Sequence, residues 1–358
     1  RKIIPQAPLI LGEVVISEFV ASNGSSFQDD NGDSPDWIEI WNATDTVVDL
    51  EGWYLTDDPE TPTQWPFPSL SLKPDAVLLV LASGEIADDR TNTDGLLHTN
   101  FTLDKAGSYL ALMKPNDKGG TELAHAYAPY PSPQLRDVAF GLFGNKSPLS
   151  MGYLTTPTPG RHNQGPGVKG FVADTKFSPN RGFYDKPINV SITSATDEAL
   201  IRYTTDGSIP TLENGQDYLE DSGIRIERTT IVRASAFKEG FHPTNTDTHT
   251  FLFVNDIVEQ PARPDGFPTT WTGWDYAMED NEAHLALIAG TPNLAPAEAK
   301  AVVADALRDL PALSLTMPVS NWFSPSSGIY HNTEGRGMGW ERACSAEYFF
   351  AGENPSER

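Results

Sequence analysis

The stretch Asp36-Trp37-Ile38-Glu39-Ile40-Trp41-Asn42 decides the fold class of the first part of the chain. Its two isoleucines fall on one face of an extended chain and Glu39 on the other, which is the period of two expected of a β-strand. Comparable short apolar runs lie at 14–20, 77–81 and 109–113, with Gly, Pro, Asp and Asn clusters between them. Short runs separated by turn signals favour a β-sandwich over a parallel βαβ fold.

The composition of the whole chain narrows its class. A length of 358 residues predicts two or three domains. The formal net charge of −24 argues against nucleic acids and against anionic lipid surfaces as partners, because both require a basic face. It suits a secreted, soluble protein or one that binds cations. The single cysteine, Cys344, leaves no internal disulfide and no cysteine-based zinc site.

The sequence shows neither a signal peptide nor a membrane-spanning segment. The first residues, Arg1-Lys2-Ile3-Ile4-Pro5, contain no apolar core of a signal peptide, so such a peptide is absent or already removed. No apolar run approaches the ~20 residues that a membrane-spanning helix needs, and we predict no membrane insertion. From the strongly negative net charge, and with the signal peptide absent or removed, we expect a secreted or cell-surface protein.

Six phrases within 10–165 occur in the order found in the bacterial branch of the lamin-tail domain family, which this part of the chain resembles. The resemblance implies an immunoglobulin-like β-sandwich without catalytic activity, used as an attachment or spacer module. The phrases are Val15-Ile16-Ser17-Glu18-Phe19, Asp36 to Asn42, Leu50 to Asp57, Leu97 to Phe101, Tyr109 to Leu112 and Thr156-Pro157-Thr158-Pro159-Gly160.

A second β module is predicted over 170–254, after a segment rich in proline and glycine that reads as a linker. Asp206-Gly207 is a strong tight-turn signal, and 230–237 reads as a strand. The phrase Tyr203-Thr-Thr-Asp-Gly-Ser-Ile-Pro-Thr211 resembles the chitobiase and β-hexosaminidase C-terminal domain family. That resemblance implies a small immunoglobulin-like sandwich. We expect Asp206 to form the turn and not to act as a catalytic acid, because glycoside hydrolysis needs a second carboxyl at a set distance.

The last part, 257–358, is predicted to be the start of an α+β domain. Residues 296–310 form the clearest helix, with Val302, Val303, Ala306, Leu307 and Leu310 on one face. Gly328-Ile-Tyr, Arg336-Gly and Trp340-Glu-Arg then resemble the opening of the CotH kinase family. In that family the nucleotide and metal residues come later, so none is assigned here. The predicted fold is therefore mainly β: two immunoglobulin-like β-sandwiches in tandem followed by a partial α+β module.

An acidic loop is the candidate metal site. Carboxylate and amide oxygens are the hard ligands that Ca²⁺ prefers, and Glu18 and Glu39 would complete a site if their strands brought them close. The loop is not an EF-hand, because Gly32 is its fourth residue and Ile40 its twelfth. The alternative is a solvated turn in which Asp and Asn bond to their own backbone. The candidate ligands are Asp29, Asp30, Asn31, Asp33 and Asp36.

Aromatic side chains suggest a second kind of site, since exposed rings stack on sugars. We expect Trp37, Trp41, Trp53 and Tyr54 to fill the core of the sandwich instead. Trp65, flanked by Thr63, Gln64 and Pro66, is predicted to be the most exposed and is the candidate ligand-binding residue.

These observations favour a set of non-catalytic binding or structural modules in a secreted or cell-surface multidomain bacterial protein. The modules would attach to a cell-surface or extracellular protein or polysaccharide and would be stabilised by calcium if the acidic loop binds it. Two alternatives stay open: the N-terminal targeting portion of a CotH-type atypical protein kinase, and a carbohydrate-binding accessory region of a glycan-active enzyme. The sequence predicts no catalytic residue and no oligomeric state.

Overall fold

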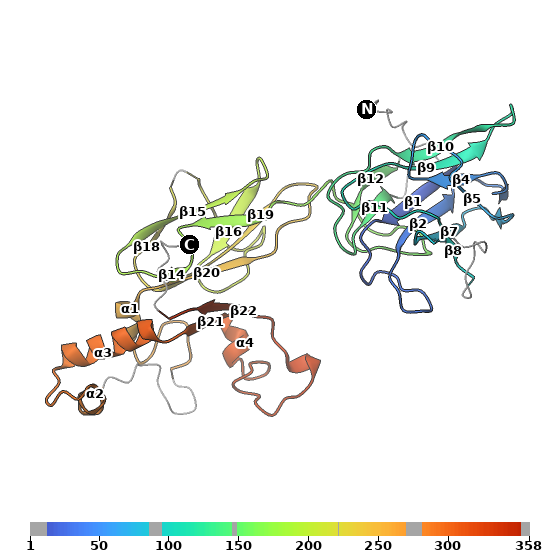
Figure 1. Ribbon diagram of the computed structural model, residues 1–358. Coiled ribbons are helices and arrows are strands. Elements are labelled where there is room, and N and C mark those ends of the chain that lie inside the picture. The colour runs from blue at the N-terminus through green and yellow to red at the C-terminus, as the bar shows by residue number, and fades with distance from the viewer. Residues whose placement is uncertain (1–12, 86–94, 145–148, 221, 270–280, 352–358) are drawn as a thin grey trace. The chain divides into compact units, whose positions relative to one another are not determined.

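The computed structural model of the chain describes residues 13–85, 95–144, 149–220, 222–269 and 281–351. The chain divides into two compact units, Arg1–Gly170 and Phe171–Arg358. Strands dominate both units, which confirms the predicted mainly β fold (Figure 1).

The first unit is built from two main sheets. The six-stranded sheet has the order β12-β11-β1-β2-β7-β8, and the four-stranded sheet has the order β10-β9-β4-β5. Neighbours are antiparallel except β7 and β8. The strands are β1 (Val14–Val20), β2 (Asp36–Asn42), β4 (Tyr54–Thr56), β5 (Trp65–Pro66), β7 (Val77–Ala82), β8 (Leu97–His98), β9 (Leu110–Pro115), β10 (Thr121–Tyr127), β11 (Ala139–Phe143) and β12 (Ser150–Leu154), and β3 (Val48–Asp49) pairs separately with β6 (Ser71–Leu72).

The two sheets pack face to face. Phe19 and Phe140 of the six-stranded sheet contact Tyr127 of the four-stranded sheet, with ring centroids 5.3 and 5.7 Å apart. Ile38 and Ile40 are fully buried, as the alternation in β2 predicts. The opposite face of β2 carries Trp37 and Glu39, and these are fully buried as well. The six-stranded sheet is therefore covered on both faces, and charged side chains on its outer face lose contact with water.

The second unit begins with a smaller sandwich. Its sheets have the orders β13-β15-β18 and β14-β20-β19-β16-β17. Buried residues from both sheets form one core, which includes Val190, Ile192, Val232 and Phe251. The strands are β13 (Thr175–Ser178), β14 (Gly182–Phe183), β15 (Ile188–Ser194), β16 (Leu200–Thr204), β17 (Gln216–Asp217), β18 (Ile224–Ile226), β19 (Thr230–Phe237) and β20 (Asp247–Leu252).

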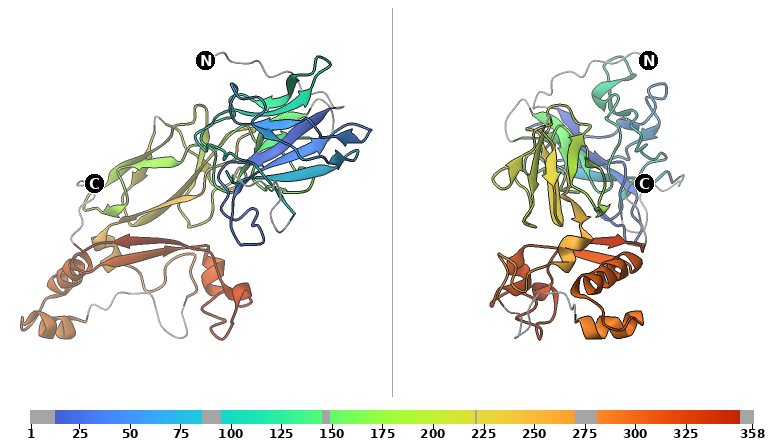
Figure 2. Two further views of the ribbon diagram at one scale, coloured as in Figure 1. Left: turned by 45° about the vertical axis from the view of Figure 1, so that its right-hand side comes forward. Right: turned by 90° about the vertical axis from the view of Figure 1, so that its left-hand side faces the viewer.

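Helices and a two-stranded ribbon complete this unit. Figure 2 shows the ribbon with α3 near one of its ends and α4 near the other. Among the described residues, no helix has the length and apolar composition required to cross a bilayer. The elements are α1 (Val254–Val258), α2 (Glu282–Ala289), α3 (Pro296–Asp309), α4 (Val319–Phe323), the 3₁₀ turn η1 (Met338–Trp340) and the strands β21 (Ala312–Thr316) and β22 (Ser345–Phe349).

Helix α3 matches the helix predicted from the sequence. Val303 and Ala304 are buried against Val254 and Val258 of α1. Ala306, predicted to share the apolar face, is exposed, and so is Leu310, at 61%. Leu310 is the residue that follows the last turn and has an extended backbone, so the helical period no longer places it on that face.

Candidate binding site

The acidic loop of the first unit folds as a turn. Oδ1 of Asp29 accepts the backbone N–H groups of Asn31 and Asp33, at 3.0 and 2.9 Å. Asp30, Asn31 and Asp33 are exposed, whereas Asp36 is half-buried and accepts the N–H of Asn23. Burial raises the pKa of Asp36 to about 6. Among the described residues, no three His, Cys, Asp or Glu side chains are arranged to hold a metal ion, and calcium binding by the loop stays a prediction.

The predicted exposure of Trp65 is wrong. Its side chain is 3% exposed and contacts Phe67 edge to face, with ring centroids 4.9 Å apart. The polar neighbour Gln64 explains the difference, because its Oε1 accepts hydrogen bonds from Thr56 Oγ1 and Asp57 N–H and so ties the loop to β4. A ring buried in this way has no face open to a sugar.

The other aromatic side chains follow the core prediction in part. Trp37 and Trp53 are buried, at 0% and 8% exposed. Trp41 and Tyr54 are only half-buried. Trp41 uses its indole N–H to donate to Oδ1 of Asp75, at 3.1 Å. The polar end of this ring therefore stays at the surface.

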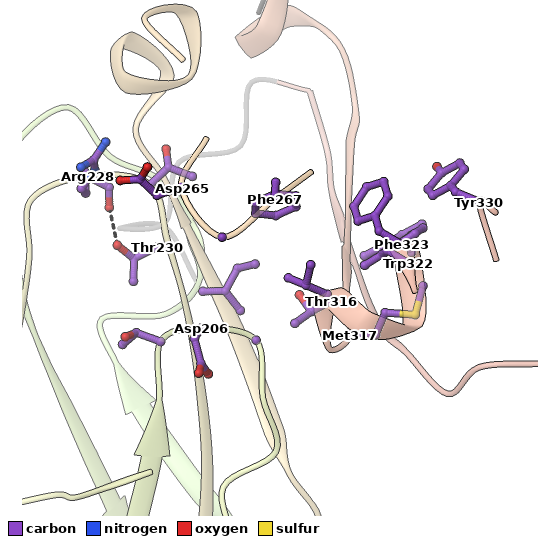
Figure 3. A pocket seen from close by; sticks show the side chains of 17 residues that line it. Asp206, Arg228, Thr230, Asp265, Phe267, Thr316, Met317, Trp322, Phe323 and Tyr330 are labelled. Carbon is purple, nitrogen blue, oxygen red and sulfur yellow. Dashed lines mark hydrogen bonds between the residues drawn. The ribbon is translucent and has the colours of Figure 1, made fainter. Parts of the chain in front are cut away.

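The second unit contains a cavity of about 760 Å³ between the sandwich and the segments that follow it. Figure 3 shows Trp322, Phe323 and Tyr330 on one side of this space and Arg228 and Asp265 on the other, with Phe267 between the two groups. The walls come from the turn after β16, the residues around the start of β19, the segment around residue 266, β21 and α4. Sequence reasoning missed this site because its walls are more than 100 residues apart in the chain.

A chain of aromatic contacts forms one wall. The ring of Phe267 contacts Phe323 edge to face, with centroids 6.0 Å apart. Tyr330 stacks on Phe323 at 5.5 Å and on Trp322 at 5.3 Å. Phe267 is 43% exposed, so part of its ring faces solvent. The wall therefore offers an apolar surface that is partly accessible to a ligand.

The other walls carry charge. Oδ1 of Asp206 accepts hydrogen bonds from the N–H and the Oγ–H of Ser208, and these bonds lower the pKa of the Asp206 carboxyl. This geometry confirms Asp206 as a turn former. Arg228 is largely exposed and lies 3.3 Å from Oδ1 of Asp256. The cavity thus combines ionised groups with aromatic rings, a combination found in many ligand sites.

Buried polar contacts hold the ribbon on the sandwich. Glu347 of β22 accepts the backbone N–H of Thr250 at 3.1 Å and also the Thr250 hydroxyl, and Arg181 lies 3.7 Å away. Burial raises the pKa of Glu347, and the hydrogen bonds and Arg181 oppose this effect. Arg233 of β19 donates to the carbonyl of Gly207 at 2.9 Å. These bonds position two walls of the cavity.

The structure also brings Glu18 and Glu39 together, as direct partners on neighbouring strands. Their hydrogen bonds go to Ser17, Thr158 and Arg161 and not to the acidic loop. The sequence had indicated these two glutamates only as additional calcium ligands.

Two family models match parts of the chain. The Lamin Tail Domain model matches residues 11–127, and the Chitobiase/beta-hexosaminidase C-terminal domain model matches residues 179–249. These matches confirm two of the three resemblances. Both families are immunoglobulin-like modules, which is consistent with non-catalytic binding or structural roles. No curated protein matches the chain. The CotH resemblance over 257–358 stays a prediction.

Proposed function

We propose that the chain is a non-catalytic attachment protein that holds an extracellular or cell-surface polysaccharide in the cavity of its second unit. The observation that carries this proposal is the aromatic wall of the cavity facing charged side chains. A pyranose ring likewise combines apolar and polar surface, with C–H groups on its faces and hydroxyl groups at its edge. Stacking on a ring such as Phe267 and hydrogen bonds to Asp206 or Arg228 would use both parts.

The size of the cavity supports a sugar over a folded partner. A volume of about 760 Å³ lies within the ~300–1,000 Å³ range of small-ligand sites. A cavity of this volume accommodates a few sugar units. A stable protein complex instead buries a surface of ~800 Å² on each partner. The negative charge of the chain directs the choice further, toward a neutral or basic polysaccharide and away from a strongly anionic one.

Binding of the intact chain to a glycan array tests the proposal. We expect binding to neutral or amino-sugar polymers, and we expect Phe267→Ala to weaken it at least tenfold because the exposed part of the ring is lost. Tyr348→Ala is the matched control, since Tyr348 is 48% exposed in the same unit but does not line the cavity. Equal binding by both variants, or no binding to any glycan, would contradict the proposal.

Calcium binding by the Asp29–Asp36 loop is a separate proposal. A ligand that binds only the folded state raises its stability. We expect a chelator to lower the melting temperature of the chain and Asp29→Asn to remove that effect. A melting temperature that does not respond to the chelator would leave the loop as a solvated turn.

A further inference from the structure

A β-bulge sets two acidic side chains opposite each other in the six-stranded sheet of the first unit. Ile16 of β1 pairs with Ile40 of β2, but the next pair along the strands is Glu18 with Glu39, so Ser17 is an extra residue. Side chains of directly opposed residues have their Cβ atoms ~4.5–5.5 Å apart. The bulge therefore sets two carboxyl groups side by side on the outer face of the sheet.

Both carboxyl groups are fully buried, with 0% exposure. The cover over them is the segment 158–163, which follows β12. Thr158 donates its N–H and its hydroxyl to Oε1 of Glu18, at 2.8 and 3.0 Å. The N–H of Arg161 donates to Oε2 of Glu39 at 3.1 Å. The carboxyl groups thus hold the covering segment in place.

The covering segment has its own local structure. Arg161 N–H bonds to the carbonyl of Thr158, with Pro159 and Gly160 between them and φ of +73° at Gly160, as a type II turn requires. Asn163 then donates to the carbonyls of Ser17 and Leu142, at 3.1 and 2.7 Å. The segment is anchored at both ends, and its middle rests on the two carboxyl groups.

One carboxylate oxygen has no partner. Within the described residues, Oε2 of Glu18 has no hydrogen-bond donor, although it is buried. The donors to the other three oxygens are all neutral. They are Thr158, the backbone N–H groups of Gly160 and Arg161, and the Ser17 hydroxyl, which bonds Oε1 of Glu39 at 2.7 Å. Two ionised carboxylates in this position would repel each other. The oxygen without a hydrogen-bond donor would also lose its hydration, which is unfavourable because no protein group replaces the water.

The neighbouring titratable groups do not neutralise the pair. On β10, Tyr127 donates its hydroxyl to the carbonyl of Ile16, and burial and the charge of Glu18 raise its pKa. His125 accepts the N–H of Ile16, and burial lowers its pKa to about 4, so it is neutral near pH 7. On the covering segment, the Arg161 side chain is exposed, and His162 contacts Trp41 and Asp75. β11 and β12 present glycines here.

The titration of the pair agrees with this geometry. Burial raises the pKa of Glu18 to about 7, against the opposing hydrogen bonds from Thr158. Burial likewise raises the pKa of Glu39 to about 8, where the Ser17 bond lowers it and the charge of Glu18 raises it. At least one carboxyl group is therefore protonated near neutral pH.

We propose that Glu18 and Glu39 share one proton, carried on Oε2 of Glu18 and donated to the Glu39 carboxylate, and that this proton latches residues 158–163 onto the sheet. The latched state binds the proton more tightly than the released state, in which the carboxyl groups have ordinary acidity. Rising pH therefore favours release. Between the ordinary glutamate pKa of ~4.3 in the released state and the raised pKa values of about 7 and 8 in the latched pair, each pH unit shifts the equilibrium toward release by about tenfold. Above about pH 8 the shift levels off, because neither state then holds the proton.

Hydrogen exchange of the intact chain tests the latch. The amides of Thr158 and Arg161 report on it directly, because they donate to the two carboxyl groups. After correction for the intrinsic rate, we expect full protection below about pH 4, a loss of about tenfold per pH unit from about pH 5 to about pH 8, and no further loss above that. Core amides such as that of Val80 should stay protected over the same range.

Glu18→Gln is the decisive variant, because its amide N–H₂ replaces Oε2 and donates to Glu39 at every pH. We expect protection of Thr158 and Arg161 to become independent of pH. Glu51→Gln, an exposed glutamate of the same unit, should keep the wild-type profile. If Glu18→Gln does not fold, Glu39→Gln carries the same expectation.

Three results would overturn the latch. Protection in the wild type that does not change with pH would mean that no proton is released. A parallel loss at Val80 would mean that the whole unit unfolds. Protection at neutral pH that a chelator abolishes would mean that a cation, and not a proton, neutralises the pair.

Discussion

At the scale of single residues, burial depends on neighbours that are remote in sequence. Trp65 stands between polar residues, which predicted a surface position, yet it is 3% exposed. Trp41 was expected in the core and keeps its indole N–H at the surface. The polarity of adjacent residues did not decide either case. Gln64 accepts hydrogen bonds from β4 that fix the loop of Trp65, and Asp75 accepts the indole N–H of Trp41.

Replacement of Trp65 by alanine should therefore act on stability. Removing a buried tryptophan costs about 3–5 kcal/mol, through lost apolar contact and the cavity left behind. We expect Trp65→Ala to lower the free energy of unfolding of the first unit by about this amount, measured by urea denaturation. Trp41→Ala, at a half-buried ring, is the control and should cost clearly less. Similar small losses in both variants would contradict the burial of Trp65.

At the scale of elements, the bulge in β1 requires a matching glycine on the neighbouring strand. Gly141 of β11 lies opposite Glu18. A Cβ atom at this position would come within 2.3 Å of the Ser17 carbonyl and 2.6 Å of the Glu18 Cα. Both are backbone atoms that cannot move without disturbing the strand pairing. The absence of a side chain at 141 thus permits the approach of β11 that helps bury Glu18.

Gly141→Ala should consequently destabilise the first unit. Overpacking against fixed backbone typically costs about 1–3 kcal/mol. Gly120→Ala is the matched control, because its Cβ would meet only the Asn116 side chain, at 3.5 Å. The measurement is again urea denaturation, joined with hydrogen exchange at Arg161. Tolerance of Gly141→Ala equal to that of Gly120→Ala would show that the strands are farther apart than described.

At the scale of the whole molecule, each unit has hydrophobic clusters of its own. One cluster of the first unit includes Trp37, Leu81 and Leu154, and that of the second includes Val190 and Phe251. Separate cores unfold as separate cooperative units when little apolar surface is shared, and a single unfolding free energy then does not describe the chain.

We therefore expect two transitions in calorimetry of the intact chain. Gly141→Ala should lower the midpoint of one transition and leave the other unchanged. A variant in the second core, Val190→Ala, should do the reverse, since Val190 is fully buried there. If either substitution moved both transitions equally, the division into two units would not describe how the chain unfolds.

The sequence by itself determined the elements whose signals are local. Alternation in 36–42 predicted β2, Asp206-Gly207 predicted a tight turn, and the apolar period of 296–310 predicted α3. These features depend on side chains a few residues apart, so they can be predicted from the sequence alone. The two family matches add that such local patterns were sufficient to recognise both sandwiches.

Only the tertiary structure decided the sites. A single extra residue in β1 sets Glu18 opposite Glu39, and a segment about 140 residues later in the chain covers them, as the bond from Thr158 shows. The cavity likewise joins Asp206 to the aromatic wall at Phe323. The physical reason is that burial, pKa and shape depend on which distant segments exclude water from a group, and periodicity along the chain does not encode that choice.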